Sequence, residues 1–173
     1  MANTINFSYE TLKTFCEIAF EKLGFNSDDS KKITDVLLLS DLYGIESHGM
    51  QRLVRYHKGI EKGLIKIDAK PEVVFETPVS LVIEGNDGMG QLNGIFAMEK
   101  AIEKAKKNGV CIATVRNSNH FGIAGYYAKM ACDQGLMGFA MTNSEAIMVP
   151  TFSRLAMLGS NPIAMSMPAE PYP

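Results

Sequence analysis

A histidine lies among small polar residues in the stretch 117–122, which reads NSNHFG. An apolar run typical of a strand precedes it at 110–115, and a run with helical periodicity follows it at 123–134. Loops that lead from the carboxyl end of a strand into a helix are where α/β proteins place much of their chemistry. An imidazole in such a loop could exchange a proton with a substrate oxygen or nitrogen, so His120 is a candidate acid–base residue. The competing interpretation is a loop histidine that hydrogen-bonds only to backbone.

A second candidate site lies in the stretch 44–59, GIESHGMQRLVRYHKG. On a continuous helix, His48, Arg52 and Arg55 share one face because they follow the i, i+4, i+7 spacing. The opposite face carries apolar residues and another histidine: Met50, Leu53, Val54, His57 and Ile60. Arginine offers a planar pair of donors to a carboxylate and imidazole moves protons near neutral pH, so the first face could bind a small anion.

The expected helix at 47–62 begins with Ser47 as its N-cap and ends before Gly63. Its free N–H groups and the positive end of its dipole would also favour an anion at His48. The alternative is a solvated helix face with no ligand. His57, on the apolar side, is expected to pack against the core.

A third stretch, MTNSEAIMVP, ends an expected strand in Thr142, Asn143 and Ser144. Hydroxyl and amide groups at the end of a strand can bind the sugar or phosphate of a ligand, but they also form ordinary turns. The three histidines of the chain follow no HExxH or histidine–carboxylate spacing, so we expect no metal site. No GxSxG nucleophile motif occurs.

The stretch 87–94, DGMGQLNG, resembles a dinucleotide-binding fingerprint because Gly88 and Gly90 lie between an expected strand and helix. The fingerprint fails, however, because Asn93 occupies the position of its third glycine. The next expected strand, at 110–115, also lacks the acidic residue that would close it. We therefore expect these glycines to form a turn.

Periodicity and helix-breaking residues define the elements that must position these side chains. They predict helices at 9–23, 28–43, 47–62, 92–107 and 123–134, and strands at 73–76, 80–84, 110–115, 136–142 and 163–167. The predicted fold class is α/β (α+β), with a helical N-terminal part followed by an α/β body. We expect a helical domain at 1–70, which carries the SHGxxR motif, and a partial α/β domain at 71–173.

Composition narrows the class of protein. The net charge is −2, so a nucleic-acid groove or an anionic membrane surface is not expected. No apolar run reaches the roughly 20 residues that span a bilayer, and the N-terminus MANTINFSYE does not resemble a secretory signal. Three unclustered cysteines suit a reducing cytosol, so the expected location is cytoplasmic.

Five stretches, in order and spacing, resemble the malate/L-lactate dehydrogenase family of nicotinamide-dependent oxidoreductases. They are DLYGIESHGMQRLVRY, DGMGQLNG, VRNSNHFGIAGYYA, MTNSEAIMVP and LGSNPIAMSMPA. The resemblance covers nearly all 173 residues. The family includes ureidoglycolate dehydrogenase, sulfolactate dehydrogenase and Δ1-piperideine-2-carboxylate reductase.

The resemblance implies a fold unlike that of Rossmann dehydrogenases, with a helical domain and part of a nicotinamide-binding α/β domain. It implies hydride transfer between NAD or NADP and a small 2-hydroxy or 2-oxo acid of the malate, lactate, ureidoglycolate or sulfolactate type, in a homodimer. By motif, His120 is expected to act as acid–base and substrate-binding residue, and His48, with Ser47 as its partner, is the other candidate proton donor. Arg52 is the expected carboxylate anchor. The expected cofactor contacts are Ser144, Gly159, Ser160 and Asn161.

The chain departs from the family pattern in length and in one motif. Members of the family are expected to be about twice as long and to continue past NPIA…P into a further cofactor-binding motif and an active-site aspartate, which this sequence does not contain. VPTFSRLAM also lacks the usual glycine pair after VxP. We therefore interpret the chain as an N-terminal half. The alternative function is a catalytically silent fragment that acts only as a binding module or needs a separate second half.

Overall fold

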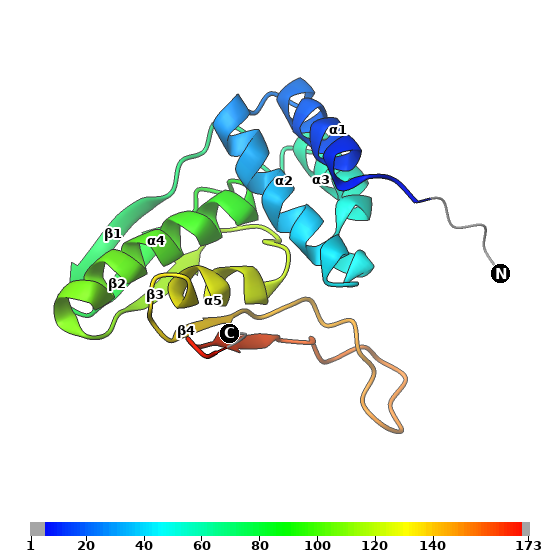
Figure 1. Cartoon of the computed structure of the whole chain (residues 1–173). Coiled ribbons are helices and arrows are strands. Elements are labelled where there is room, and N and C mark those ends of the chain that lie inside the picture. The colour runs from blue at the N-terminus through cyan, green and yellow to red at the C-terminus, as the bar shows by residue number, and fades with distance from the viewer. Residues whose placement is uncertain (1–5, 171–173) are drawn as a thin grey trace. The chain divides into compact units, whose positions relative to one another are not determined.

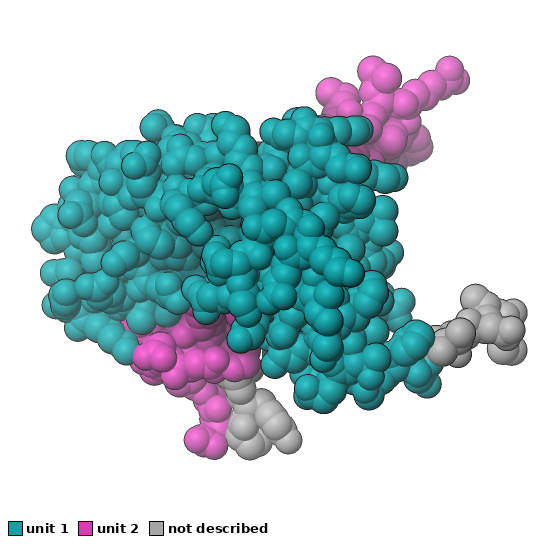
Figure 2. All heavy atoms as spheres, turned by 90° about the horizontal axis from the view of Figure 1, so that it is seen from above, with its two compact units in different colours: residues 1–123 teal, residues 124–173 magenta. Residues whose placement is uncertain are grey.

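A computed structural model describes residues 6–170 of the chain (Figure 1). The chain forms two compact units, Met1–Ile123 and Ala124–Pro173 (Figure 2). Both contain helices and strands, which confirms the predicted α/β class. These units meet between residues 123 and 124, whereas the sequence suggested a domain boundary after residue 70. The boundary at residue 70 stays a prediction. Among residues 6–170, no helix is long and apolar enough to cross a bilayer.

Three helices form the N-terminal part of the first unit: α1 (Tyr9–Lys22), α2 (Ser27–Leu42) and α3 (Leu53–Glu61). Side chains cap the first two, because Ser8 accepts a hydrogen bond from the Thr11 N–H and Asn26 accepts one from the Asp29 N–H. The helices enclose a core of buried side chains to which a residue of the 85–89 turn also contributes. Its members are Phe20, Phe25, Ile33, Leu37, Tyr56, Ile65 and Met89.

The predicted continuous helix at 47–62 is wrong at its N-terminal end. Two short 3₁₀ turns, η1 (Glu46–His48) and η2 (Met50–Arg52), precede α3. They meet at Gly49, where the Asp41 carboxylate accepts a hydrogen bond of 2.8 Å from the Met50 N–H. A Cβ at Gly49 would lie 1.8 Å from an oxygen of Asp41, so a larger residue would displace the carboxylate from the Met50 N–H. Ser47 lies inside η1 and is not the cap of a longer helix.

The predicted apolar face of this helix is also partly wrong. Tyr56 is 1% exposed and is the buried residue that α3 contributes to the core. Leu53 and Ile60 are partly buried and pack against the same core. Val54 is 57% exposed. His57 does not pack against the core either, because its half-exposed ring lies 3.3 Å from the Glu61 carboxylate. The buried face therefore follows Leu53, Tyr56 and Ile60, which is also a helical spacing.

A three-stranded sheet completes the first unit, in the order β1–β2–β3. β1 (Glu72–Thr77) runs antiparallel to β2 (Ser80–Glu84), and β2 runs parallel to β3 (Ile112–Arg116). Helix α4 (Gly90–Asn108) connects the two parallel strands, and buried Ala97 of α4 packs in one cluster with Leu81 and Ile83 of β2. Because β2 and β3 are parallel, the segments that follow them begin at the same edge of the sheet. This edge positions the NSNHFG loop beside the DGMG turn.

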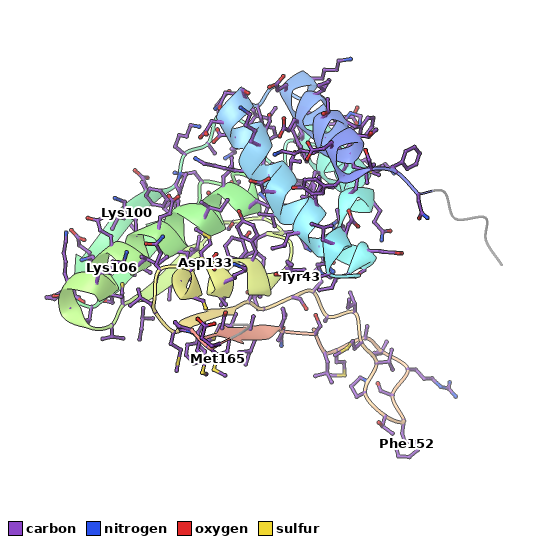
Figure 3. The ribbon with its side chains drawn as sticks, viewed as in Figure 1. Tyr43, Lys100, Lys106, Asp133, Phe152 and Met165 are labelled. Atoms are coloured by element: carbon purple, nitrogen blue, oxygen red, sulfur yellow. The ribbon has the colours of Figure 1, made fainter. Side chains whose placement is uncertain are left out.

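The second unit contains helix α5 (Ala124–Cys132) and the antiparallel strands β4 (Gly138–Met141) and β5 (Ile163–Ser166). Gly138 packs against α5 so closely that an added Cβ would lie 2.2 Å from the Ala128 carbonyl oxygen. Between the strands, residues 142–162 form a long loop with a bridge between Met148 and Leu158. Phe152 lies at the tip of this loop, fully exposed (Figure 3).

Candidate active site

Asn119 fixes the NSNHFG loop to the edge of the sheet. Its side-chain amide donates to the carbonyl oxygens of Leu64, Asp87 and Gly88, at 3.1, 2.9 and 3.0 Å. The backbone adds a second connection, because the Asp87 N–H donates to the Asn117 carbonyl at 2.8 Å. The asparagines of this loop, which suggested a turn, thus also hold the segment that carries His120.

The predicted turn role of the DGMG glycines is correct for Gly88, whose N–H closes the turn by donating to the Gly85 carbonyl oxygen at 2.8 Å, but not for Gly90. Asn86 and Asp87 are the central residues of this turn and adopt its positive φ angles, 53° and 58°. At Gly90 an added Cβ would lie 2.2 Å from the Asn119 carbonyl oxygen and 2.3 Å from that of His120. Gly90 therefore allows α4 to begin directly against the backbone of the His120 loop.

The structure brings the two predicted histidines together. The ring of His120 stacks on the ring of His48, with centroids 5.3 Å apart and an interplanar angle of 28°. The Tyr56 hydroxyl lies 2.8 Å from His120 Nδ1, and the Gly122 N–H donates to the same nitrogen at 3.3 Å. Gly122 has a φ of +84°, and an added Cβ would lie 2.6 Å from Val36, so glycine is required there.

Ser47 and Arg52 belong to the same cluster through short local contacts. Ser47 Oγ lies 2.9 Å from Nδ1 of His48. The Arg52 side chain folds back so that its Nε donates to the Ser47 carbonyl oxygen at 2.5 Å. Within residues 6–170 the Arg52 guanidinium makes this hydrogen bond through Nε alone, so its two terminal NH₂ groups can bind the two oxygens of a carboxylate. The predicted site residues Ser47, His48, Arg52 and His120 are therefore neighbours in the fold.

Burial and positive charge hold both imidazoles in their neutral form. Burial, followed by the charges of Arg52, His48 and Arg55, lowers the pKa of His120 from 6.5 to about 4. Burial and then Arg52 also lower the pKa of His48. Burial raises the pKa of Tyr56 to about 12, so its hydroxyl stays protonated. An anion bound here would offset the positive field and raise the pKa of both histidines again.

The four predicted cofactor contacts also lie together, in the second unit. Ser144 Oγ accepts a hydrogen bond of 2.9 Å from the Ser160 N–H, and Asn161 Oδ1 accepts one of 2.9 Å from the Ser144 N–H. Gly159 fits closely, because an added Cβ would lie 2.5 Å from Ser144 Oγ. They come from the two ends of the long loop, and the exposed Ser144, Ser160 and Asn161 carry hydroxyl and amide donors that suit the ribose or amide groups of a nicotinamide dinucleotide. The donor set therefore fits part of such a cofactor.

Sequence reasoning missed Tyr56 and Gln91. Gln91 is fully buried at the start of α4, and its side-chain nitrogen donates to the Tyr56 hydroxyl at 2.7 Å. Tyr56 follows His48 and Arg52 at the same four-residue step, which was an available signal. No local pattern indicates Gln91, because its partner lies 35 positions away along the chain.

Comparison with known proteins identifies the family. The sequence profile of the malate/L-lactate dehydrogenase family matches residues 7–173, and the chain belongs to this family. Malate dehydrogenase from Pyrococcus abyssi is 44% identical over 171 residues, which are 99% of this chain and 47% of that protein. Ureidoglycolate dehydrogenase (NAD(+)) from Escherichia coli O157:H7 is 31% identical over 165 residues, which are 94% of this chain and 47% of that protein.

Solved structures give the same result for the fold. The structure of malate dehydrogenase from Pyrococcus horikoshii OT3 superposes with a TM-score of 0.94 at 43% identity, over 98% of this chain and 49% of that one. The resemblance noted in the motifs is thus confirmed. The chain spans about half the length of the relatives that it matches.

Proposed function

We propose that this chain forms the substrate-binding part of an oxidoreductase that moves a hydride between NAD or NADP and a small 2-hydroxy acid. The observation that carries the proposal is the cluster of His48 and His120 beside Arg52, in a chain 44% identical to a malate dehydrogenase. A 2-hydroxy acid offers a carboxylate and, on the adjacent carbon, a hydroxyl and a hydrogen. These three groups match an arginine, an imidazole and a hydride acceptor.

In the proposed reaction, the terminal NH₂ groups of Arg52 bind the carboxylate and fix the orientation of C2. Oxidation breaks the O–H and C2–H bonds and forms a carbonyl. The proton moves to an imidazole of the His48–His120 pair, and the hydrogen at C2 leaves with both electrons. A bound nicotinamide cofactor would supply the hydride acceptor. Neutral imidazoles suit this role, because an imidazolium cannot accept the hydroxyl proton.

Ser47 and the second unit take supporting roles in the proposal. Ser47 orients His48 through the contact between its Oγ and Nδ1. Ser144, Gly159, Ser160 and Asn161 would hold the cofactor through their hydroxyl, amide and backbone groups, which hydrogen bonds between the two ends of the loop hold together. The names of the relatives support NAD(+) as one possible cofactor, and malate or ureidoglycolate as the kind of substrate. We also propose a homodimer as the working assembly, which light scattering over a range of concentrations tests.

The rate of NADH or NADPH oxidation with oxaloacetate, pyruvate or glyoxylate tests the function. Two preparations are needed: the 173-residue chain, and the same chain fused to the part of the Pyrococcus horikoshii enzyme that it does not cover. We expect turnover in at least the fused protein and its loss in His120→Asn, with Lys58→Gln as an active control on an exposed position of α3. If both preparations fold but neither turns over any of these acids, the chain is a silent binding module instead.

A further inference from the structure

A chain of three buried or partly buried polar groups leads from the start of α4 to His120. Gln91 is 0% exposed and Tyr56 is 1% exposed. The Gln91 side-chain nitrogen donates to the Tyr56 oxygen at 2.7 Å, and the Tyr56 oxygen lies 2.8 Å from His120 Nδ1. Because the phenol accepts from Gln91, its own proton is directed to Nδ1.

A backbone group fixes the direction of this chain independently. The Gly122 N–H points at the same Nδ1 at 3.3 Å, and an N–H can only donate. If the Gln91 amide were turned, Tyr56 would donate to it, and Nδ1 would have to carry a proton that faces the Gly122 N–H. Two donors therefore converge on Nδ1, which must be the unprotonated nitrogen of the ring.

The Gly122 N–H thereby also fixes the orientation of the Gln91 amide, whose nitrogen must face Tyr56. The amide oxygen is buried and has no hydrogen-bond partner among the described residues. Turning the amide would leave its NH₂ group in that position instead, so the unsatisfied oxygen does not favour the turned amide.

We propose that Tyr56 and Gln91 are positioning residues that hold His120 as the neutral tautomer with its proton on Nε2. Within the described part of the chain, Nε2 has no hydrogen-bond partner and can donate to a ligand. Resting on the proposed function, the structure assigns His120 the task of donating this hydrogen bond to the reacting oxygen at C2. A neutral imidazole of lowered pKa polarises a carbonyl in this way in triosephosphate isomerase. Proton exchange then belongs to His48, the other ring of the stacked pair.

Nitrogen NMR of the histidine rings tests the tautomer without requiring activity. In the 173-residue chain labelled with ¹⁵N-histidine, we expect His120 to show an unprotonated Nδ1 and a protonated Nε2 near neutral pH. Tyr56→Phe removes one of the two donors to Nδ1, so we expect mixed tautomers and a pKa of His120 that rises toward its ordinary value. Tyr43→Phe is the matched control at an exposed tyrosine, and it should leave the ring signals unchanged.

A protonated Nδ1 in the wild-type chain would overturn the inference, as would a tautomer unaffected by Tyr56→Phe. If Tyr56→Phe does not fold, Gln91→Met keeps the volume of the side chain, removes its donor to Tyr56 and should shift the tautomer in the same direction. In an active preparation, Tyr56→Phe should lower kcat about tenfold, as expected for one lost hydrogen bond, with little change in KM. A fixed tautomer without dehydrogenase activity would refute the proposed function alone, whereas activity with a mixed tautomer would refute this inference alone.

Discussion

Acid should destabilise this protein through His120, and the size of the effect follows from its surroundings. Burial, together with the charges of Arg52, His48 and Arg55, lowers the pKa of the ring from 6.5 to about 4. In the unfolded chain the imidazole titrates near its ordinary value of about 6.5. Between these two values the unfolded state binds a proton that the folded state does not. The free energy of unfolding therefore falls as the pH drops from about 6.5 toward about 4.

At about 1.4 kcal/mol per pKa unit, this difference corresponds to at most about 3.5 kcal/mol. Partial solvent exposure of the ring reduces the expected effect to about 2 kcal/mol. The measurement is urea unfolding, followed by circular dichroism, for the wild type and His120→Asn over this pH range. Asparagine keeps an oxygen that can accept from the Tyr56 hydroxyl but does not titrate. We expect the stability difference between the two proteins to shrink by about 2 kcal/mol on acidification.

The control for this experiment is Lys58→Gln, which changes charge at an exposed position of α3 and does not alter an acid-titrating group. Its stability should follow the wild type in parallel across the pH range. If His120→Asn also runs parallel to the wild type, burial and the arginines do not hold the His120 ring neutral. The electrostatic description of the site would then be wrong.

Two further substitutions test the geometry of the first unit. Gly49→Ala places a Cβ 1.8 Å from the Asp41 carboxylate and should lower the free energy of unfolding by about 1–3 kcal/mol. The matched control is Gly125→Ala, whose added Cβ meets no atom within 4 Å. If both substitutions change the thermal unfolding of the protein equally, the described contact between Asp41 and the Gly49 turn is wrong. Arg52→Lys keeps the charge but loses the planar pair of donors, so in an active preparation KM for the 2-oxo acid should rise about 10–100-fold. An unchanged KM for Arg52→Lys, with Lys58→Gln as reference, would remove Arg52 from the carboxylate site.

Most elements of the fold were predictable because their periodicity is local. The helix expected at 92–107 forms as Gly90–Asn108, and the strand expected at 80–84 forms as Ser80–Glu84. The helix expected at 47–62 failed because a tertiary contact decides its first turns. The Asp41 carboxylate accepts a hydrogen bond from the Met50 N–H at the Gly49 turn. Asp41 lies outside residues 47–62, so the pattern of apolar residues within that segment could not indicate this contact.

The candidate site was predictable in its residues but not in its connections. Residue type and motif indicated His48, Arg52 and His120, which the fold brings together. The supporting bond from Tyr56 to His120 joins positions 64 apart, so only the folded chain reveals it. The sequence also predicted that His57 lies on the buried face of α3, whereas Tyr56 does. The prediction failed because two different faces of this short helix carry apolar residues at helical spacing.

Titration of the 173-residue chain with oxamate, an unreactive analogue of a 2-oxo acid, tests the central claim most directly. The readouts are the heat of binding and the ring signals of the three histidines. We expect saturable binding that shifts the ring signals of His48 and His120, leaves those of His57 unchanged and raises the pKa of His120. This binding should weaken strongly in Arg52→Lys. Binding that leaves the His48 and His120 signals unchanged, or no binding by the folded chain, would contradict the claim that this cluster recognises a 2-oxo acid.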